Sequence, residues 1–465
     1  MNPSLPAVEA AQIIFWVLLP LVLFAPARWG VLVWLVMGNL DTTGPNFTVS
    51  TDVGWMNAVK GIVLPLWLCW RLRSVSSDTA RALPARLWIA LTAYVAIASL
   101  WSPFPLAAAK LVGNMTGTLL TFIVLEKAAR RGVLSFGGLS VLVIASLVLA
   151  GLQTFYYGGA AYGFDGTDQP TRFTSFISAQ QFGAFLVAFL AALLWVRRNS
   201  SWTDIMLSLV VTFALVLNGS RTWFFGAVLV AVVYFCLSFR RVFAGLLVGA
   251  GTLILGFLLI LNLVPSGQDL FGGTSSRIVA TLKALATGTD TANNLGLANF
   301  NFRLAIYSDA IDEIRTADVP LLLFGHGTSS GGNVIMRVFP YLYKLDRLDP
   351  NRAIHNEWLR ALYEWGILGF VLLSACFLSL VGGLVAHRPH EGSNVRAPAI
   401  LSFLPAFLLA FTTENVMAGA GNAITMSFAL IVALLWSNSV STERIAVGGT
   451  RQLSTMRWAR RSAHA

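Results

Sequence analysis

A basic side chain at Arg221 lies where a charge is costly. It follows Asn218-Gly219-Ser220 and separates two apolar runs, which places it near the depth of a membrane. A charge there costs a few kcal/mol unless it is paired or hydrated, and a guanidinium binds anions by paired hydrogen bonds. Arginines that extend their side chains to the membrane surface usually lie on the cytoplasmic side. Arg221 is expected on the opposite side. We therefore interpret Arg221 as an anion-binding residue.

Arg303 lies on a predicted helix over 301–314. Apolar side chains recur there at helical spacing, at Leu304, Tyr307, Ile311 and Ile314. Asn301 is the candidate N-cap of this helix. Arg303 precedes Tyr307 by one turn, and the ordinary role of such an arginine is a solvated surface position. Anion binding is the alternative role.

His355 lies just before Asn356, where a long polar segment meets the next apolar run. A helix that starts near Asn356 would direct its amide dipoles toward an anion. Imidazole titrates near neutrality and can exchange protons, although a lone histidine is more often structural. His326, between Gly325 and Gly327, indicates a tight turn rather than a nucleotide loop.

The sequence gives no support for a metal or another cofactor. No group of His, Cys, Asp or Glu has the spacing of metal ligands. Each of the three cysteines lies inside an apolar run, which argues against a disulfide framework. Three polar residues lie in or near the last apolar runs: Glu364, Glu414 and Asn415. Each could equally mark the end of a helix or have a functional role.

The composition predicts a membrane protein. The chain has 465 residues, of which 56% are apolar and only 11% are charged, whereas soluble domains carry about 25% charged residues. The net charge of +11 comes from clustered Lys and Arg. Such clusters are typical of membrane topology signals, and we expect no nucleic-acid partner.

The apolar runs predict an all-α polytopic membrane protein with about 12 transmembrane helices. They lie at 11–26, 29–40, 55–70, 86–101, 105–125, 136–157, 175–196, 203–218, 221–239, 242–264, 358–385, 397–416 and 419–437. Pro20 and Pro26 interrupt the first two runs, whose assignment therefore stays open.

Basic clusters orient these spans. Turns rich in Lys and Arg, such as those at 71–86, 127–131 and 240–241, are expected in the cytoplasm. The predicted domains are N-terminal transmembrane helices (1–264), a large periplasmic loop (265–357), C-terminal transmembrane helices (358–438) and a basic cytoplasmic tail (439–465). One long loop of this size is usually functional or disordered.

The order of these motifs resembles a known family. Ser220-Arg221 is followed by Arg303, then by Leu323-Phe324-Gly325-His326-Gly327, and finally by His355-Asn356-Glu357-Trp358-Leu359, which leads into Leu362-Tyr363-Glu364-Trp365-Gly366-Ile367-Leu368-Gly369. This pattern resembles the O-antigen ligase and polysaccharide polymerase family of bacterial inner membranes. The motif resemblance is confined to about 218–225 and 300–370.

The resemblance implies a multi-pass protein of the inner membrane, with a GT-C-like helical fold and an active site that faces the periplasm. It implies metal-independent, inverting glycosyl transfer from a polyprenyl-diphosphate-linked glycan to a glycan or lipid A core acceptor. Arg221 and Arg303 would bind the diphosphate, and His355 would accept a proton from the acceptor or orient it. Tyr341 and Tyr343 are candidate sugar-stacking residues, or ordinary loop packing.

Two other functions remain open at this point. A ligase would move a finished chain to the lipid A core, whereas a polymerase would join repeat units; the absence of any feature that indicates a lipid A core acceptor favours the polymerase. A transporter of polysaccharide or lipid-linked glycan is the alternative from another class. Transporters often contain inverted repeats, and the sequence has no obvious duplicated halves.

Overall fold

The structure of the chain is a computed structural model. It describes residues 5–40, 55–77, 79–134, 136–156, 173–177, 179–196, 202–218, 220–238, 295–338, 354–386, 396–413, 416–418 and 424–434. Over these residues the fold is helical, and the only β-type pairing is an isolated bridge between Leu40 and Phe176. The predicted all-α class is therefore confirmed for the described part.

Ten helices of the N-terminal half follow the predicted apolar runs. They are α1 (Leu5–Phe24), α2 (Ala27–Met37), α3 (Trp55–Ala58), α4 (Leu64–Arg71), α5 (Leu83–Ala98), α6 (Pro105–Arg130), α7 (Phe136–Gly151), α8 (Ala179–Val196), α9 (Trp202–Asn218) and α10 (Arg221–Ser238). A π-helical turn joins α3 to α4 over Val59–Val63. Proline in the first turn starts α5 and α6, where its missing N–H costs nothing.

Three helices occupy the described part of the predicted loop, and two long helices follow. They are α13 (Leu295–Thr316), α14 (Val319–Phe324), α15 (Gly331–Val338), α16 (Glu357–Ala386) and α17 (Arg396–Thr413). The predicted helix over 301–314 is confirmed. The prediction that Asn301 caps it is wrong, because the helix begins six residues earlier, through the good helix formers Leu295, Leu297 and Ala298.

Four of the described helices are long and apolar enough to cross a membrane: Leu83–Trp101, Pro105–Arg130, Gly137–Tyr156 and Glu357–Gly383. Six shorter apolar helices accompany them in the described segments: Glu9–Phe24, Ala27–Met37, Gln180–Leu194, Met206–Asn218, Thr222–Val232 and Ile424–Leu434. This supports the general prediction of a helical membrane protein. The count of about 12 spans and the periplasmic loop stay predictions, and the run at 242–264 lies outside the described residues.

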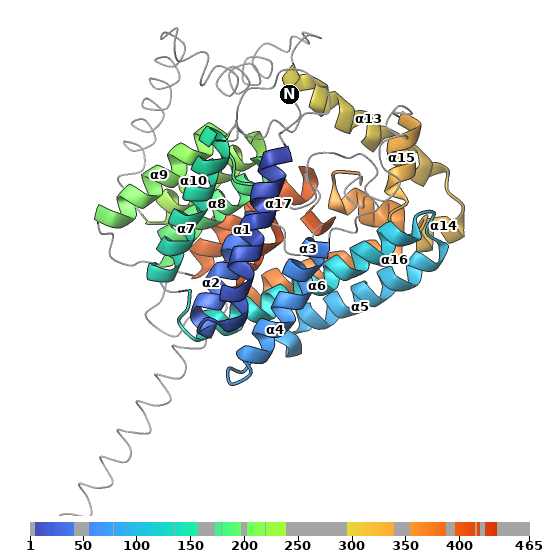
Figure 1. The fold of residues 1–465 in the computed structure, drawn as a ribbon. Helices are drawn as coiled ribbons and strands as arrows, with labels where there is room; N and C mark the ends of the chain where they lie inside the picture. The colour runs from blue at the N-terminus through green and yellow to red at the C-terminus, as the bar shows by residue number, and fades with distance from the viewer. Residues whose placement is uncertain are drawn as a thin grey trace, which may run out of the picture.

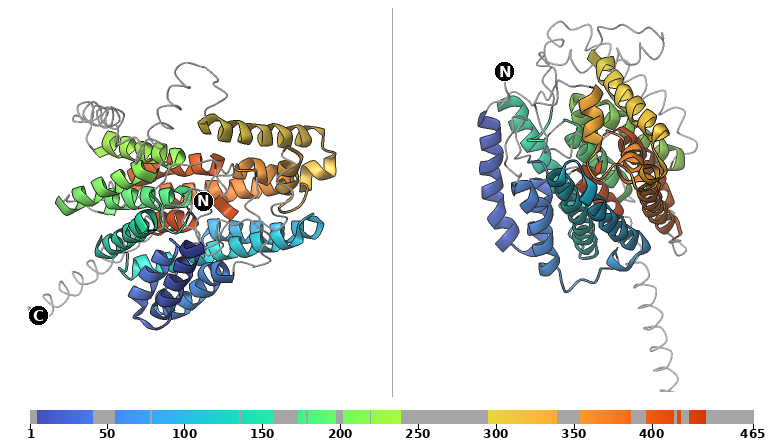
Figure 2. Two further views of the ribbon diagram at one scale, coloured as in Figure 1. Left: turned by 45° about the horizontal axis from the view of Figure 1, so that its top comes forward. Right: turned by 90° about the vertical axis from the view of Figure 1, so that its right-hand side faces the viewer.

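The helices from the predicted loop gather at one edge of the molecule. In Figures 1 and 2, α13 lies beside α14 and α15 at this edge, whereas α9 lies on the opposite side of the bundle. Helix α16 runs from this edge into the bundle, where it packs along α5. The start of α16 is therefore the place where the loop helices and the membrane helices meet.

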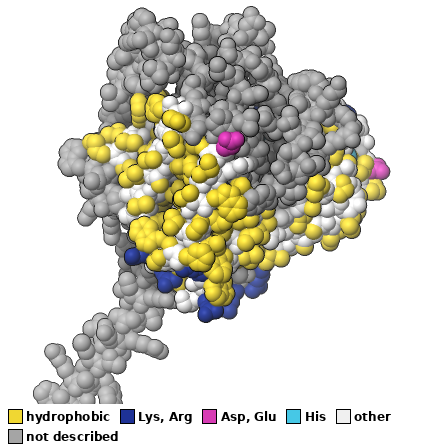
Figure 3. All heavy atoms as spheres, in the orientation of Figure 1, with side chains coloured by type: hydrophobic (Ala, Val, Ile, Leu, Met, Phe, Trp, Pro, Cys, Tyr) yellow, Lys and Arg dark blue, Asp and Glu magenta, His cyan; other side chains and the backbone are white. Residues whose placement is uncertain are grey.

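The surface has the polarity expected of a lipid-facing protein. Among the described residues on the face shown in Figure 3, hydrophobic side chains predominate, and Lys and Arg gather along the lower edge. In the connection between α4 and α5, Arg73 and Arg81 are exposed. Basic side chains at one edge of an apolar belt are typical of the cytoplasmic side, and the orientation of the chain in the membrane stays a prediction.

Candidate functional site

His355 is held in a turn that few residues adopt. Its φ of 49° lies in the left-handed region, which is uncommon for a residue with a side chain. The next residue, Asn356, caps α16: its Oδ1 atom accepts hydrogen bonds from the backbone N–H groups of Trp358 and Leu359, both at 3.1 Å. The cap therefore ties the backbone of the turn to the first turn of α16.

Tyr307 fixes the same turn from α13. Its hydroxyl donates a hydrogen bond to the carbonyl oxygen of His355 at 2.7 Å, and Thr412 offers a second carbonyl acceptor at 3.3 Å. Thr412 belongs to the last turn of α17. One side chain thus connects the loop helix, the His355 turn and a membrane helix, although these segments are far apart in the sequence.

The imidazole of His355 is neutral at physiological pH. Burial, the Arg303 guanidinium and the Arg360 guanidinium, in that order of size, lower the pKa of His355 to about 3. Its Nδ1 atom is buried and makes no hydrogen bond within the part of the chain that the structure describes. Arg303 is partly buried on α13, one turn before Tyr307. The structure therefore brings Arg303 and His355, two of the three predicted catalytic residues, close enough to interact electrostatically.

Arg221 is the first residue of α10, and its side chain lies outside the described part of the structure. The preceding Ser220 is buried, and α10 packs against α17 where Gly226 approaches Ala406. The proximity of Arg221 to His355 therefore stays a prediction. Tyr341 and Tyr343 lie outside the described residues, so the stacking role also stays a prediction.

Three charged side chains at the start of α16 were not recognised together from the sequence. Glu357, Arg360 and Glu364 are all fully buried. Arg360 lies between the two carboxylates, with Nε 3.2 Å from Glu364 Oε1 and Nη1 3.6 Å from Glu357 Oε2. Their spacing of three and four residues puts them on one helix face, and this is the signal that could have revealed them.

The two glutamates join α16 to other segments. Glu364 accepts hydrogen bonds from the backbone N–H groups of Ser329 (2.8 Å) and Gly331 (3.2 Å) in the glycine-rich turn. Glu357 accepts one from the backbone N–H of Met417 at 2.7 Å. Each buried carboxylate thus accepts from the backbone and also pairs with Arg360, and both interactions offset the cost of burying a charge.

The glycine-rich turn packs against a break in α16. Gly366 has a φ of 64° inside this helix, and the break frees two carbonyl groups. Tyr363 and Glu364 accept there from the backbone N–H groups of His326 (3.0 Å) and Gly327 (2.9 Å). The ring of His326 also stacks on Tyr363, with centroids 4.3 Å apart. These contacts agree with the interpretation of His326 as part of a structural turn.

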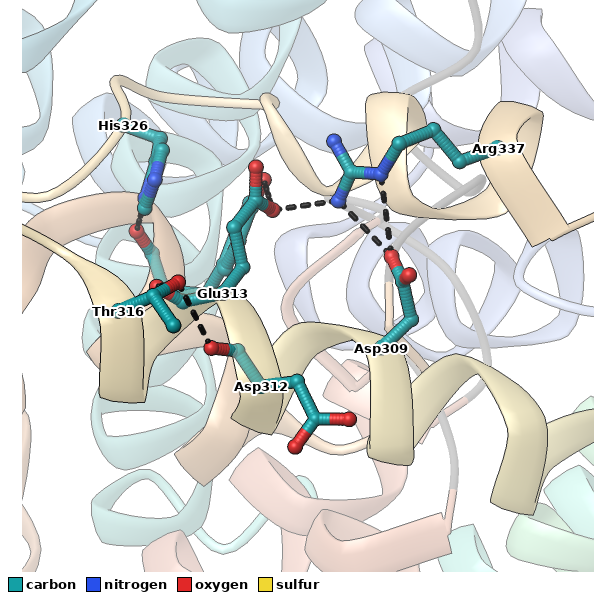
Figure 4. A network of polar contacts seen from close by, with 7 residues as sticks. Asp309, Asp312, Glu313, Thr316, His326 and Arg337 are labelled. Atoms are coloured by element: carbon teal, nitrogen blue, oxygen red, sulfur yellow. Dashed lines mark hydrogen bonds and ion pairs between the residues drawn. The ribbon is translucent and has the colours of Figure 1, made fainter.

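At the surface, Arg337 of α15 forms ion pairs with side chains of α13. As Figure 4 shows, its guanidinium faces Asp309 and Glu313, and Nη2 lies 2.8 Å from Asp309 Oδ2. Burial alone would lower the pKa of Arg337, but hydrogen bonds to Asp309, Tyr363 and Glu313 raise it. The Tyr363 hydroxyl donates to Glu313. The cluster therefore connects α13, α15 and α16.

An apolar cavity lies within the helix bundle, beside the later turns of α16. It is lined by α5, α6, α16, α17 and the segments 416–417 and 425–433, mainly with aromatic and aliphatic side chains such as Trp88, Phe122, Phe377 and Phe407. Met417 lines this cavity and also donates to Glu357. Glu126 is the one charged residue among the described residues of the lining, and an apolar space of this kind suits a hydrocarbon chain.

Replacement of Glu364 by glutamine is expected to lower the stability of the folded protein by about 2 kcal/mol. In Glu364, Oε2 accepts a hydrogen bond from the Ser329 N–H, and Oε1 accepts one from Gly331 and pairs with Arg360. The amide NH₂ of glutamine would therefore face another donor in either orientation. Thermal unfolding in detergent would measure the loss. Glu9→Gln, at an exposed position of α1, is the control, and equal stability of both variants would contradict the assigned contacts.

Comparison with known proteins gives one family match. Residues 205–374 match the model of the family described as O-antigen ligase. No curated protein matches the chain. The matched region contains Arg221, Arg303 and His355, and it supports an enzyme of the O-antigen ligase and polymerase type, with a glycosyltransferase-like activity. Among the described residues, no three His, Cys, Asp or Glu side chains are grouped as metal ligands.

Proposed function

We propose that this O-antigen ligase-like chain polymerises polysaccharide repeat units on the periplasmic face of a bacterial inner membrane. It transfers a glycan from a polyprenyl-diphosphate carrier to a hydroxyl of the acceptor glycan, with inversion and without a metal. The observation that carries this proposal is the environment of His355. A neutral imidazole lies near Arg303 on a backbone turn that Tyr307 and Asn356 hold in place, within the region that matches the family.

The reaction requires one proton transfer and one displacement. His355 accepts the proton of the acceptor hydroxyl while that oxygen attacks the anomeric carbon. The bond from this carbon to the diphosphate oxygen breaks, and the electron pair leaves with the diphosphate. A single displacement of this kind inverts the anomeric configuration. Arg303 and Arg221 stabilise the departing negative charge, which grows as the bond breaks.

Binding of the donor is expected to strengthen His355 as a base. In the free protein its imidazole is neutral but weakly basic, since burial and the charges of Arg303 and Arg360 disfavour protonation. A bound diphosphate would offset those positive charges, and a nearby anion raises the proton affinity of an imidazole. His355 would therefore become a stronger base when the donor is in place.

The apolar cavity suits the lipid part of the donor. It lies between α5, α6, α16 and α17, and its Met417 wall contacts the buried Glu357 near the His355 turn. In this proposal the polyprenyl chain of the donor occupies this space. This placement is compatible with the large apolar content of the lining, because isoprenoid chains offer no hydrogen-bonding groups.

Removal of the Arg303 charge tests the proposal. In proteoliposomes with a lipid-linked oligosaccharide and a chelator, Arg303→Ala is expected to lower the transfer rate about 100-fold. Arg303→Lys keeps the charge without the paired donors and should retain more activity. Arg315→Ala is the matched control, because Arg315 lies on the same helix with 74% of its side chain exposed.

The outcomes separate the alternatives. Wild-type transfer that stops in the presence of the chelator would contradict the metal-free mechanism, and full activity of Arg303→Ala would contradict the site. A ladder of products is expected of a polymerase, whereas a single transfer to a lipid A core acceptor would identify a ligase. If the wild type transfers no glycan from any donor but moves lipid-linked glycan across the bilayer, the protein is a transporter.

A further inference from the structure

Helix α14 is apolar on every side. Its six residues, Val319–Phe324, include no charged or polar side chain. None of them is buried, and Val319 leaves 68% of its surface exposed. A helix that is hydrophobic all round normally lies in a protein core or in a membrane. The described part of the protein provides no core that encloses α14, so another environment must cover it.

The C-terminal end of α14 is bound to α5, which belongs to a candidate membrane span. The Tyr94 hydroxyl donates a hydrogen bond to the carbonyl oxygen of Phe324, and the indole N–H of Trp101 donates one to that of Gly325, both at 3.3 Å. Helix ends leave such carbonyl groups without partners, and in a membrane every backbone polar group needs one. Helix α14 also packs along α16, which lies in a second candidate span (Figure 1).

The candidate span of α5 sets the depth of α14. This span, Leu83–Trp101, has 19 residues and is about 28 Å long, close to the roughly 30 Å thickness of the hydrocarbon core. Trp101 then lies at the interface between membrane and water, where tryptophan is enriched. Tyr94 lies about 10 Å deeper along the helix. The end of α14 contacts both side chains and therefore lies within the outer part of the apolar layer.

Exposed apolar side chains continue from α14 onto both spans. Beside its C-terminal end, Leu100 leaves 84% of its surface exposed, and Ile97 and Trp101 are exposed as well. On α16, Ile367 and Leu368 directly follow the helix break against which α14 packs, and both are exposed. An apolar surface that continues along two membrane helices is a surface that lipid covers.

We propose that α14 is embedded in the bilayer, in the leaflet on the side of the predicted loop, and anchors the loop helices there. A helix of six residues is about 9 Å long, too short to cross the membrane, so it enters one leaflet only. The polarity of the chain changes just before this helix. Asp312 and Arg315 are exposed near the end of α13, and Asp318 caps α14 by accepting a hydrogen bond from the Leu321 N–H at 3.1 Å. Helix α13 therefore ends among the lipid headgroups.

Labelling with a charged, water-soluble maleimide tests this placement. Val319→Cys and Asp312→Cys are compared in the full chain, reconstituted into liposomes of phosphatidylethanolamine and phosphatidylglycerol, and mass spectrometry identifies the labelled peptide. Both positions lie on the same side of the bilayer, so a mixed orientation affects them alike. Val319→Cys should react about tenfold more slowly, because an apolar environment disfavours the reactive thiolate. Equal rates would overturn the proposal.

A photoreactive side chain identifies what covers α14. Phe324→p-benzoylphenylalanine keeps an aromatic side chain at an exposed position, so it also serves if Val319→Cys does not fold. Arg315→p-benzoylphenylalanine, at an exposed position of α13, is the control. After irradiation in the same liposomes, a lipid adduct is expected at position 324 and none at position 315.

A covalent dimer in place of the lipid adduct would show that a second copy of the chain covers α14, and it would overturn the proposal. So would equal lipid adducts at the two positions, because the control lies on the water side of the cap. Neither measurement uses a glycan, so the membrane anchor is tested independently of the proposed function.

Discussion

Replacement of His355 by alanine is expected to lower the kcat of glycan transfer by about 10²–10⁴-fold, the usual contribution of a general base. The imidazole is neutral, and no other histidine of the described residues shares its environment beside Arg303. The measurement is transfer in proteoliposomes with saturating acceptor and a chelator present. Protein insertion is checked by size exclusion in detergent.

The kinetic constants distinguish two roles of this histidine. If His355 accepts the proton, kcat falls and the KM of the acceptor changes little. If His355 only binds or orients the acceptor, KM rises while kcat is retained. His464→Ala, near the end of the sequence, is the matched control. A His355→Ala protein with wild-type kcat would contradict the role as a base.

Replacement of Gly366 by alanine is expected to destabilise the protein by about 3 kcal/mol or more. Its φ of 64° disfavours any side chain, and an added methyl group would collide with the carbonyl oxygen of Leu323. To relieve this collision, the glycine-rich turn must move away from α16. The hydrogen bonds from His326 and Gly327 to the broken helix would then be lost.

Gly382 provides the control on the same helix. A methyl group there would meet nothing within 4 Å, so Gly382→Ala should leave stability unchanged or improve it slightly. Thermal unfolding in detergent and the yield of monodisperse protein report the difference. If the two alanine variants unfold at the same temperature, the close packing of the turn on α16 is wrong.

Local patterns were sufficient to predict several parts of the site. The periodic apolar side chains of 301–314 identified the helix that carries Arg303, since periodicity needs only neighbouring residues. The position of Asn356 also predicted the start of α16, which its side chain caps. The backbone turn at His326 followed from its two flanking glycines in the same way.

Contacts between distant segments could not be predicted. Tyr307 and His355 are separated by 48 positions and meet only because α13 packs beside the start of α16. Gly366 lies within an apolar run that is indistinguishable from a continuous helix, and its positive φ has meaning only beside the glycine-rich turn. Glu357 and Arg360 resemble an ordinary surface pair in sequence until burial is known.

The backbone contact between the glycine-rich turn and α16 sets limits on how such proteins can be recombined. Gly325 and Gly366 approach so closely that neither backbone accepts a side chain, and Glu364 binds the turn from the helix. A chimera that exchanged residues 295–338 alone would place a foreign glycine-rich turn against the helix break at Gly366. That break fits the native turn. The smallest transplantable unit is therefore the helices of 295–338 together with the first three turns of α16.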